Sequence, residues 1–140
     1  MKRRSKAHSS KMHSRGFTLI EMLVVISMIL ILLSIALPMY NQSIVRSKET
    51  RLHQDLKTLN EAIDNYSLNR GHAPQSPDDL VQAGYIKFIP ADITGKSDTW
   101  KWEPEDPQNA WDPNSTGIGS VHSGSDDIST QGDAYSSWTH

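Results

Sequence analysis

The sequence contains no cysteine, so neither a disulfide bond nor a thiolate metal site can stabilise the chain. It also lacks the motifs of common catalytic centres, with no His-Glu-x-x-His run and no recognisable nucleophile motif among its residues. Its 140 residues suffice for one small domain. We therefore predict a single small head domain that is not an enzyme.

Acidic residues are absent from the first 16 positions, which hold six of the 14 lysines and arginines. The remainder has eight basic residues against 16 acidic ones, a formal charge of −8. Nucleic-acid binding needs a basic surface that replaces the counterions of phosphate. The acidic remainder therefore predicts no nucleic-acid partner.

A long apolar run at residues 17–37 follows the basic segment, without proline or glycine and with the single charge of Glu21. A helix of this length rises about 31 Å, which matches the hydrocarbon thickness of a bilayer. The basic residues before it favour a cytoplasmic N-terminus, which places the rest of the chain on the far side, the periplasm of a bacterium. The run predicts a single-pass membrane helix.

Glu21 needs an explanation, because an ionised carboxylate in hydrocarbon costs several kcal/mol and is normally retained for a partner or a function. A cut after Gly16 would give Phe17 a free amino group, which is cationic near neutral pH. The amino group of one copy can then neutralise Glu21 of a neighbour. An ordinary signal peptide has its small-residue cleavage site after the apolar stretch, whereas Gly16 precedes it. The alternative is a plain signal anchor with an accidental glutamate.

The run at residues 14–26 reads S-R-G-F-T-L-I-E-M-L-V-V-I. It resembles the class III signal motif of type IV pilins and type II secretion pseudopilins. In that family a prepilin peptidase cuts between the residues that match Gly16 and Phe17, and methylates the new N-terminus. Glu21 matches the family's glutamate, and Pro38 matches a helix-loosening proline. The resemblance implies processing at Gly16 and Phe17, and assembly through Phe17, Glu21 and Pro38.

Beyond Pro38, apolar residues recur at alternating spacings of four and three, which places them on one helical face: Leu52, Leu56, Leu59, Ile63 and Tyr66. This pattern predicts an amphipathic stem at residues 38–70 that ends near Asn69, with Gly71 as its cap. Pro38 predicts a kink or local melting, with two interpretations: a simple helix boundary, or a flexible joint used in assembly.

The predicted head is residues 71–140. A short helix should begin at Ser76 and close at Gly84. Strand-like pieces around residues 99–103 and 117–122 indicate an antiparallel sheet of about three strands. Four tryptophans are expected to pack it, with a sugar-binding platform as the less favoured alternative: Trp100, Trp102, Trp111 and Trp138.

The predicted fold is therefore α+β of the pilin type: a long N-terminal helix, membrane-spanning in its first half and amphipathic in its second, packs on a small antiparallel sheet. The expected domains are a cleaved leader at residues 1–16, a transmembrane and polymerisation helix at 17–37, a stem at 38–70 and a head at 71–140.

Residues 78–100 and 121–138 resemble the major pseudopilin of type II secretion systems. The resemblance implies an inner-membrane prepilin with a periplasmic head. It would polymerise with itself into a periplasmic filament that drives folded proteins out of the cell. The implied partners are minor pseudopilins, an inner-membrane assembly platform and the prepilin peptidase.

Three alternatives stay open at this point. The nearest is a type IV pilus subunit for adhesion, motility or DNA uptake. A monomeric, signal-anchored periplasmic binding protein would keep an unprocessed N-terminus. A calcium-dependent hydrolase would need a catalytic constellation that the sequence lacks.

The resemblance also implies one calcium ion near the C-terminus, where residues 120–133 are rich in the hard oxygen ligands that calcium prefers. The best candidate ligands are Asp126, Asp127 and Asp133. Their spacing does not match an EF-hand, and the family's glycine-rich stretch is reduced to Gly124 and Gly132. The alternative is a solvated turn region of aspartate and serine.

Overall fold

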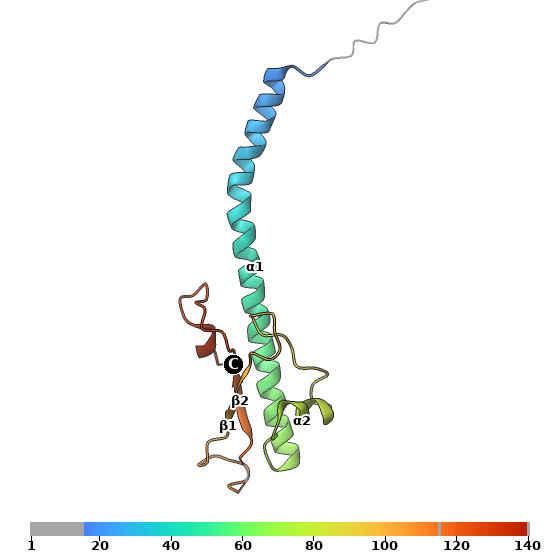
Figure 1. Cartoon of the computed structure of the whole chain (residues 1–140), viewed down its shortest axis with the longest axis vertical. Coiled ribbons are helices and arrows are strands. Elements are labelled where there is room, and N and C mark those ends of the chain that lie inside the picture. The colour runs from blue at the N-terminus through green and yellow to red at the C-terminus, as the bar shows by residue number, and fades with distance from the viewer. Residues whose placement is uncertain (1–15, 115, 140) are drawn as a thin grey trace, which may run out of the picture. The chain divides into compact units, whose positions relative to one another are not determined.

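The computed structural model describes residues 16–114 and 116–139. The predicted leader lies outside the described residues, apart from Gly16. The chain divides into two compact units, Met1–Tyr40 and Asn41–His140. Its elements are α1 (Leu19–Arg70), α2 (Pro77–Gln82), β1 (Lys101–Pro104), β2 (Ile118–His122) and the 3-10 helix η1 (Tyr135–Ser137) (Figure 1). This order confirms the predicted α+β class, with a long N-terminal helix and a small antiparallel sheet.

Local capping fixes both ends of α1. Thr18 precedes its first residue, and the Thr18 hydroxyl oxygen accepts a hydrogen bond from the Glu21 backbone N–H at 3.2 Å. At the other end Gly71 has a φ of 75° and donates its N–H to the Ser67 carbonyl at 2.8 Å. This left-handed glycine ends the helix one residue beyond the predicted position.

Pro38 lies inside α1, and the residues on both sides of it are helical. The predicted local melting and the helix boundary at this position are therefore wrong. Proline deprives the carbonyl four residues earlier of its usual donor. The neighbouring turns are rich in leucine, isoleucine, alanine and methionine, which keep the helical path. The role of Pro38 in assembly stays a prediction.

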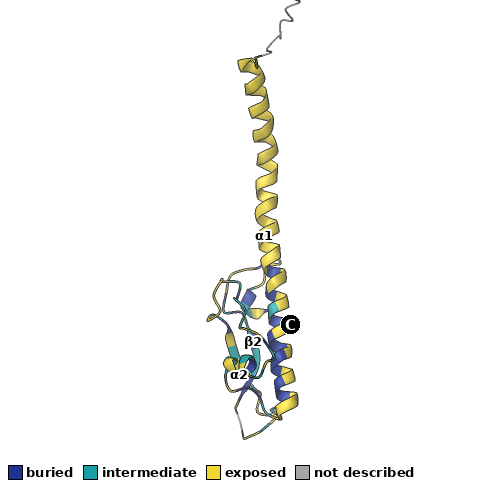
Figure 2. Ribbon diagram, turned by 90° about the vertical axis from the view of Figure 1, so that its right-hand side faces the viewer, coloured by how far each residue is buried: buried dark blue, intermediate teal, exposed yellow. Residues whose placement is uncertain are grey.

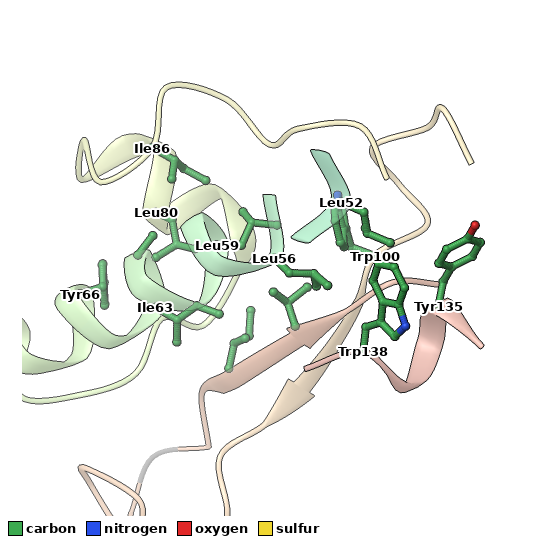
Figure 3. Packing of buried hydrophobic residues seen from close by; sticks show 13 residues of the cluster. Leu52, Leu56, Leu59, Ile63, Tyr66, Leu80, Ile86, Trp100, Tyr135 and Trp138 are labelled. Carbon is green, nitrogen blue, oxygen red and sulfur yellow. The ribbon is translucent and has the colours of Figure 1, made fainter. Parts of the chain in front are cut away.

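We call residues 19–40 the first part of α1 and residues 41–70 its second part. The second part buries one face in the head, whereas the first part has no buried residue (Figure 2). The five apolar residues predicted to share that face are each 7% exposed or less. They pack with Leu80 of α2, Ile86, Trp100, Val121 of β2 and Trp138 (Figure 3). The stem therefore supplies one wall of the core, as the spacing predicts.

The head sheet has two antiparallel strands, not the predicted three. Trp102 pairs with Val121 and Glu103 with Ser120, and a bulge follows Glu103. Beyond His122 only an isolated bridge, Ile128 with Ala134, appears among the described residues. In this region many backbone N–H groups donate to side chains instead of extending a ladder.

The Asn60 side chain of α1 makes the two backbone hydrogen bonds with Val121 of β2 that a neighbouring strand would otherwise make. Its side-chain oxygen accepts the Val121 N–H at 3.1 Å, and its amide donates to the Val121 carbonyl at 3.3 Å and the Leu56 carbonyl at 3.0 Å. Asn60 is 3% exposed. One buried amide therefore satisfies both backbone groups of a strand residue and fixes the sheet to the helix.

The four tryptophans differ in burial, which the sequence does not reveal. Trp100 and Trp138 are each 5% exposed, and Trp102 is half-buried against the core. Trp111, however, is 51% exposed, so its predicted packing role is wrong. It lies in a loop rich in aspartate, asparagine and proline.

Candidate assembly helix and C-terminal loop

The first part of α1 is an apolar helix without buried residues. It is the one helix in the described part of the chain that is long and apolar enough to cross a membrane, with a mean hydropathy of 2.8 over its most apolar window. Two hydroxyls within it donate to carbonyls of the preceding turn, Ser27 to Leu23 at 2.8 Å and Ser34 to Ile31 at 2.7 Å. These polar groups therefore have partners inside the helix, as a bilayer requires.

Gly16 and Phe17 lie immediately before α1 and both are exposed. A side chain added at Gly16 would meet no atom within 4 Å, and its φ does not require glycine. Phe17 is 76% exposed. Nothing in the described part of the chain therefore demands a glycine at position 16.

Glu21 lies exposed in the first turn of α1. A carboxylate is favourable there because the N-terminus of a helix carries a partial positive charge. Among the described residues no cationic side chain lies within 4 Å of it. In hydrocarbon, helix-end stabilisation alone would not balance the cost of an ionised carboxylate.

A second glutamate of α1 has the opposite environment. Glu49 is 5% exposed. One carboxylate oxygen accepts the Thr130 backbone N–H at 2.7 Å and the Tyr135 hydroxyl at 3.0 Å, and the other accepts the Thr130 hydroxyl at 2.6 Å. Burial by itself raises the pKa of this carboxyl, but the hydrogen bonds from Thr130 and Tyr135, with the nearby charge of Arg46, lower the pKa overall.

Residues 123–138, here called the C-terminal loop, are also held at their beginning. Asp92 is 3% exposed and accepts the Ser123 hydroxyl at 2.7 Å, the Gly124 N–H at 3.0 Å and the Thr99 hydroxyl at 3.0 Å. A Cβ at position 124 would lie 1.8 Å from the Thr99 carbonyl oxygen. Glycine is therefore required where the loop passes that backbone.

A third carboxylate closes the loop at its end. Asp133 accepts the Ser129 hydroxyl at 2.5 Å and the Trp138 indole N–H at 2.9 Å. The Ser129 hydrogen bond is the main reason why the pKa of this carboxyl is lowered. The Trp138 ring stacks on His53 of α1 with 4.0 Å between ring centroids. The end of the loop therefore contacts the stem through an aromatic pair.

Comparison with known proteins connects these features. Residues 11–37 match the family model described as prokaryotic N-terminal methylation motif. The chain is 34% identical to type II secretion system core protein G of Escherichia coli (strain K12), covering 58% of this chain and 67% of the relative. It is 31% identical to competence protein ComGC of Halalkalibacterium halodurans, covering 54% of this chain and 74% of the relative. The chain belongs to the type IV pilin-like prepilins.

This prepilin is also 34% identical to type IV major pilin protein PilE1 of Neisseria gonorrhoeae, covering 59% of this chain and 47% of the relative. No solved structure gives a significant match. The family assignment makes the prepilin a structural subunit of the pilin type, and its apolar helix fits a membrane-anchored subunit. Gly16, Phe17 and Glu21 all lie inside the matched motif, and Pro38 directly follows it.

The predicted calcium ligands of the prepilin do not converge. Asp126 faces Lys101, with 3.8 Å between the carboxylate oxygen and the ammonium nitrogen. Asp127 accepts the Ser125 hydroxyl at 3.1 Å, and both oxygens of Asp133 already accept protein donors. The part of the chain that the structure describes holds no group of three His, Cys, Asp or Glu residues suited to a metal. This arrangement does not fit a calcium site built from these three aspartates, and calcium binding stays a prediction.

The burial of Glu49 is not among the predictions from the sequence, although the spacing of the stem residues indicates it. Glu49 precedes Leu52 by three positions and so continues the alternating spacing of the apolar face. A charged residue in register with a buried stripe is rarely tolerated without a partner. That register, and not the residue type, was the available indication that Glu49 is buried.

Proposed function

We propose that this prepilin is a structural subunit of a periplasmic pseudopilus that drives export of folded proteins through a type II secretion system. The observation that carries the proposal is the similarity to core protein G of Escherichia coli, which extends over 67% of that protein. A match of that extent includes more than a 27-residue motif such as residues 11–37. The match to the competence protein is of comparable extent, so the choice of a secretion subunit rests also on the resemblance of residues 78–100 and 121–138 to the major pseudopilin.

Processing is the first step of the proposed mechanism. Cleavage between Gly16 and Phe17 by the prepilin peptidase removes the basic leader, and methylation modifies the new amino group. The exposure of both residues, and the free space at Gly16, suit access by an enzyme. The product begins with a cation next to an apolar helix.

Assembly is the second step. The amino group of Phe17 in one copy neutralises Glu21 of its neighbour as the apolar helices pack side by side. Four residues of helix correspond to about 6 Å of rise, so pairing implies an axial offset between neighbours. A helix added in another register leaves a carboxylate unpaired in an apolar environment, which is unfavourable by several kcal/mol. The pair therefore selects the register.

The remaining parts of the proposal follow from the membrane helix. The prepilin resides in the inner membrane as a single-pass protein with its head in the periplasm. An inner-membrane platform adds copies to the filament, and minor pseudopilins are further partners. Growth of the filament would push folded proteins through an outer-membrane channel.

The test is a comparison of extracellular proteomes between wild type and a strain lacking this prepilin. We expect a set of exoproteins to be lost from the medium and trapped in the periplasm. The intact gene should restore export and a Glu21→Ala gene should not. Glu61→Ala is the matched control, because Glu61 is an exposed glutamate of α1 outside the apolar part. An unchanged proteome in the deletion strain would contradict the proposal.

The second candidate is a subunit of a type IV pilus, and the similarity to the major pilin PilE1 favours it. The same deletion strain distinguishes the two. Loss of surface attachment, motility or DNA uptake with normal export would assign the prepilin to a pilus.

A further inference from the structure

A loop rich in carboxylates and hydroxyls can be ordered in two opposite ways. A bound cation gathers oxygen atoms around itself, whereas a buried carboxylate gathers N–H and O–H donors. The two arrangements differ in what the hydroxyl groups do. In the first they offer lone pairs to the metal, and in the second they donate protons to the carboxylate.

The C-terminal loop shows the second arrangement. Hydroxyl groups that the sequence offers as calcium ligands donate instead to carboxylates: Ser123 to Asp92, Ser125 to Asp127 and Ser129 to Asp133. Thr130 and Tyr135 donate to Glu49 in the same way. We propose that Glu49 takes the structural place of a bound cation and fastens the C-terminal loop to α1 through Thr130 and Tyr135.

The contacts at Glu49 are suited to this task. They connect segments that are 81 and 86 residues apart in the chain. They act together with the Asp92 contacts at the start of the loop and the His53–Trp138 stack at its end. Each bond has an ionised acceptor, which makes it about twice as strong as a bond between neutral groups. Losing the carboxylate would leave the Thr130 N–H and the Tyr135 hydroxyl without their partners.

Acid should release this contact. The titratable groups beside Glu49 are Arg46, His53, which lines the same pocket, and the Tyr135 hydroxyl. Asp127 acts on Tyr135, and Asp133 lies near His53. Because the pKa of Glu49 is lowered by folding, its contribution is complete above the ordinary glutamate pKa of about 4.3. The contribution is lost as the pH falls through the lowered value of the folded state.

The first experiment compares the processed full-length protein in detergent micelles with its Glu49→Gln and Tyr135→Phe variants. Chymotrypsin is the probe, because the loop contains Tyr135 and Trp138 but no lysine or arginine. We expect cleavage in the loop to become about tenfold faster or more in both variants, with the fragments identified by mass spectrometry. Glu61→Gln is the control and should behave like wild type. A cleavage rate unchanged by Glu49→Gln would overturn the proposal.

Thr130→Val keeps the backbone donor and removes only the hydroxyl, so it remains informative if Glu49→Gln folds poorly. The cleavage rate of Thr130→Val should be higher than that of wild type and lower than that of a double variant carrying both Thr130→Val and Tyr135→Phe. A Thr130→Val protein with wild-type cleavage at both pH 7 and pH 4 would show that the hydroxyl bond does not fasten the loop.

The second experiment adds calcium chloride or a chelator to the wild-type protein. A ligand that binds only the folded state raises Tm, by an amount that grows with its concentration. We expect no change in Tm at millimolar calcium and no faster cleavage with the chelator. A rise in Tm that disappears in an Asp126→Asn, Asp127→Asn and Asp133→Asn triple variant would show that a cation fastens the loop, and would contradict the role assigned to Glu49.

Discussion

The two parts of α1 use their apolar residues for opposite purposes. From Leu19 to Tyr40 no residue is buried, although almost all are apolar. From Asn41 to Arg70 nine residues are buried, and they form one face. The second part therefore has its partners within its own head, whereas under the proposed function the apolar side chains of the first part contact lipid and other copies of the chain.

The glutamates of the two parts show the same difference. Glu21 is exposed and has no cation within reach among the described residues, whereas Glu49 is buried and accepts hydrogen bonds from Thr130 and Tyr135. A charge that is satisfied inside the chain stabilises the monomer. Under the proposed function, the charge without a cationic partner in the described part of its own chain selects the register of neighbouring copies. The predictions below separate these two roles.

The largest expected effect is at the processing site. Gly16→Trp should leave the leader attached, because a bulky side chain blocks the peptidase while nothing in the folded chain opposes it. Intact-protein mass spectrometry of membrane extracts measures the N-terminus. Gly16→Ala is the control and should be processed at least in part. Normal cleavage of Gly16→Trp would contradict the assigned site.

A pair of leucines compares the two parts of the helix directly. Leu56 is 0% exposed and Leu30 is 61% exposed. Leu56→Ala should reduce the free energy of unfolding of the head by about 2–5 kcal/mol, because it leaves a cavity in the core. Leu30→Ala should change it by less than about 0.5 kcal/mol. Denaturant titration of the full-length protein, followed by tryptophan fluorescence, measures both, and equal losses would remove the distinction between the parts.

Asn60 tests whether a buried polar group of the stem belongs to the head. Asn60→Ala should cost about 1–3 kcal/mol of unfolding free energy, because the Val121 N–H loses its acceptor in a buried site. Asn69→Ala is the matched control, since Asn69 is exposed and its side-chain amide donates to the Tyr85 hydroxyl. The same titration gives both values, and an Asn60→Ala loss no larger than that of the control would show that the amide bridge is dispensable.

The smallest expected effect is at the start of α2. Asp79 accepts the backbone N–H groups of Ser76 at 3.0 Å and Gln75 at 2.8 Å, and the Ser76 bond is the main reason why its pKa is lowered. Its contribution is complete above the ordinary aspartate pKa of about 3.9 and is lost as the pH falls through the lowered value. Asp79→Asn should cost about 1 kcal/mol at pH 7.

Thermal unfolding of Asp79→Asn at pH 7 and pH 3 provides the check. The difference from wild type should shrink at the lower pH, because the wild-type carboxyl is then protonated in part. Asp78→Asn is the neighbouring exposed control. A difference that stays constant with pH would show that ionisation of Asp79 does not stabilise the helix start.

Strong periodicity made much of the fold predictable. The alternating spacing of leucines identified the buried face of the stem, and Gly71 identified its end, because both depend on interactions within a few residues. The local melting predicted at Pro38 was wrong, since one missing hydrogen bond does not outweigh helix-favouring neighbours, whereas the predicted kink stays a prediction. Residue spacing and capping patterns therefore predicted those features that depend on contacts within a few residues of the chain.

The loop and its anchors could not be predicted in the same way. Glu49 meets Thr130 across 81 residues of sequence, and Asn60 meets Val121 across 61, so no spacing pattern connects them. The third strand failed to form because side chains occupy the backbone donors beyond His122. Composition shows how many oxygens the loop offers but not which donors they accept, so the calcium ligands Asp126, Asp127 and Asp133 stay a prediction.

The most direct test of the central claim is the fraction of processed protein that sediments as filaments in Glu21→Ala cells, with the head Tm measured on the same preparation. The account predicts normal insertion and processing, a head Tm equal to that of wild type, and a large loss of sedimentable filaments. Glu49→Gln should show the opposite result, with a lower head Tm as its primary defect and a smaller effect on filament yield. Wild-type filament yield from Glu21→Ala would contradict the account, because it would show that the unpaired charge of the apolar helix does not direct assembly.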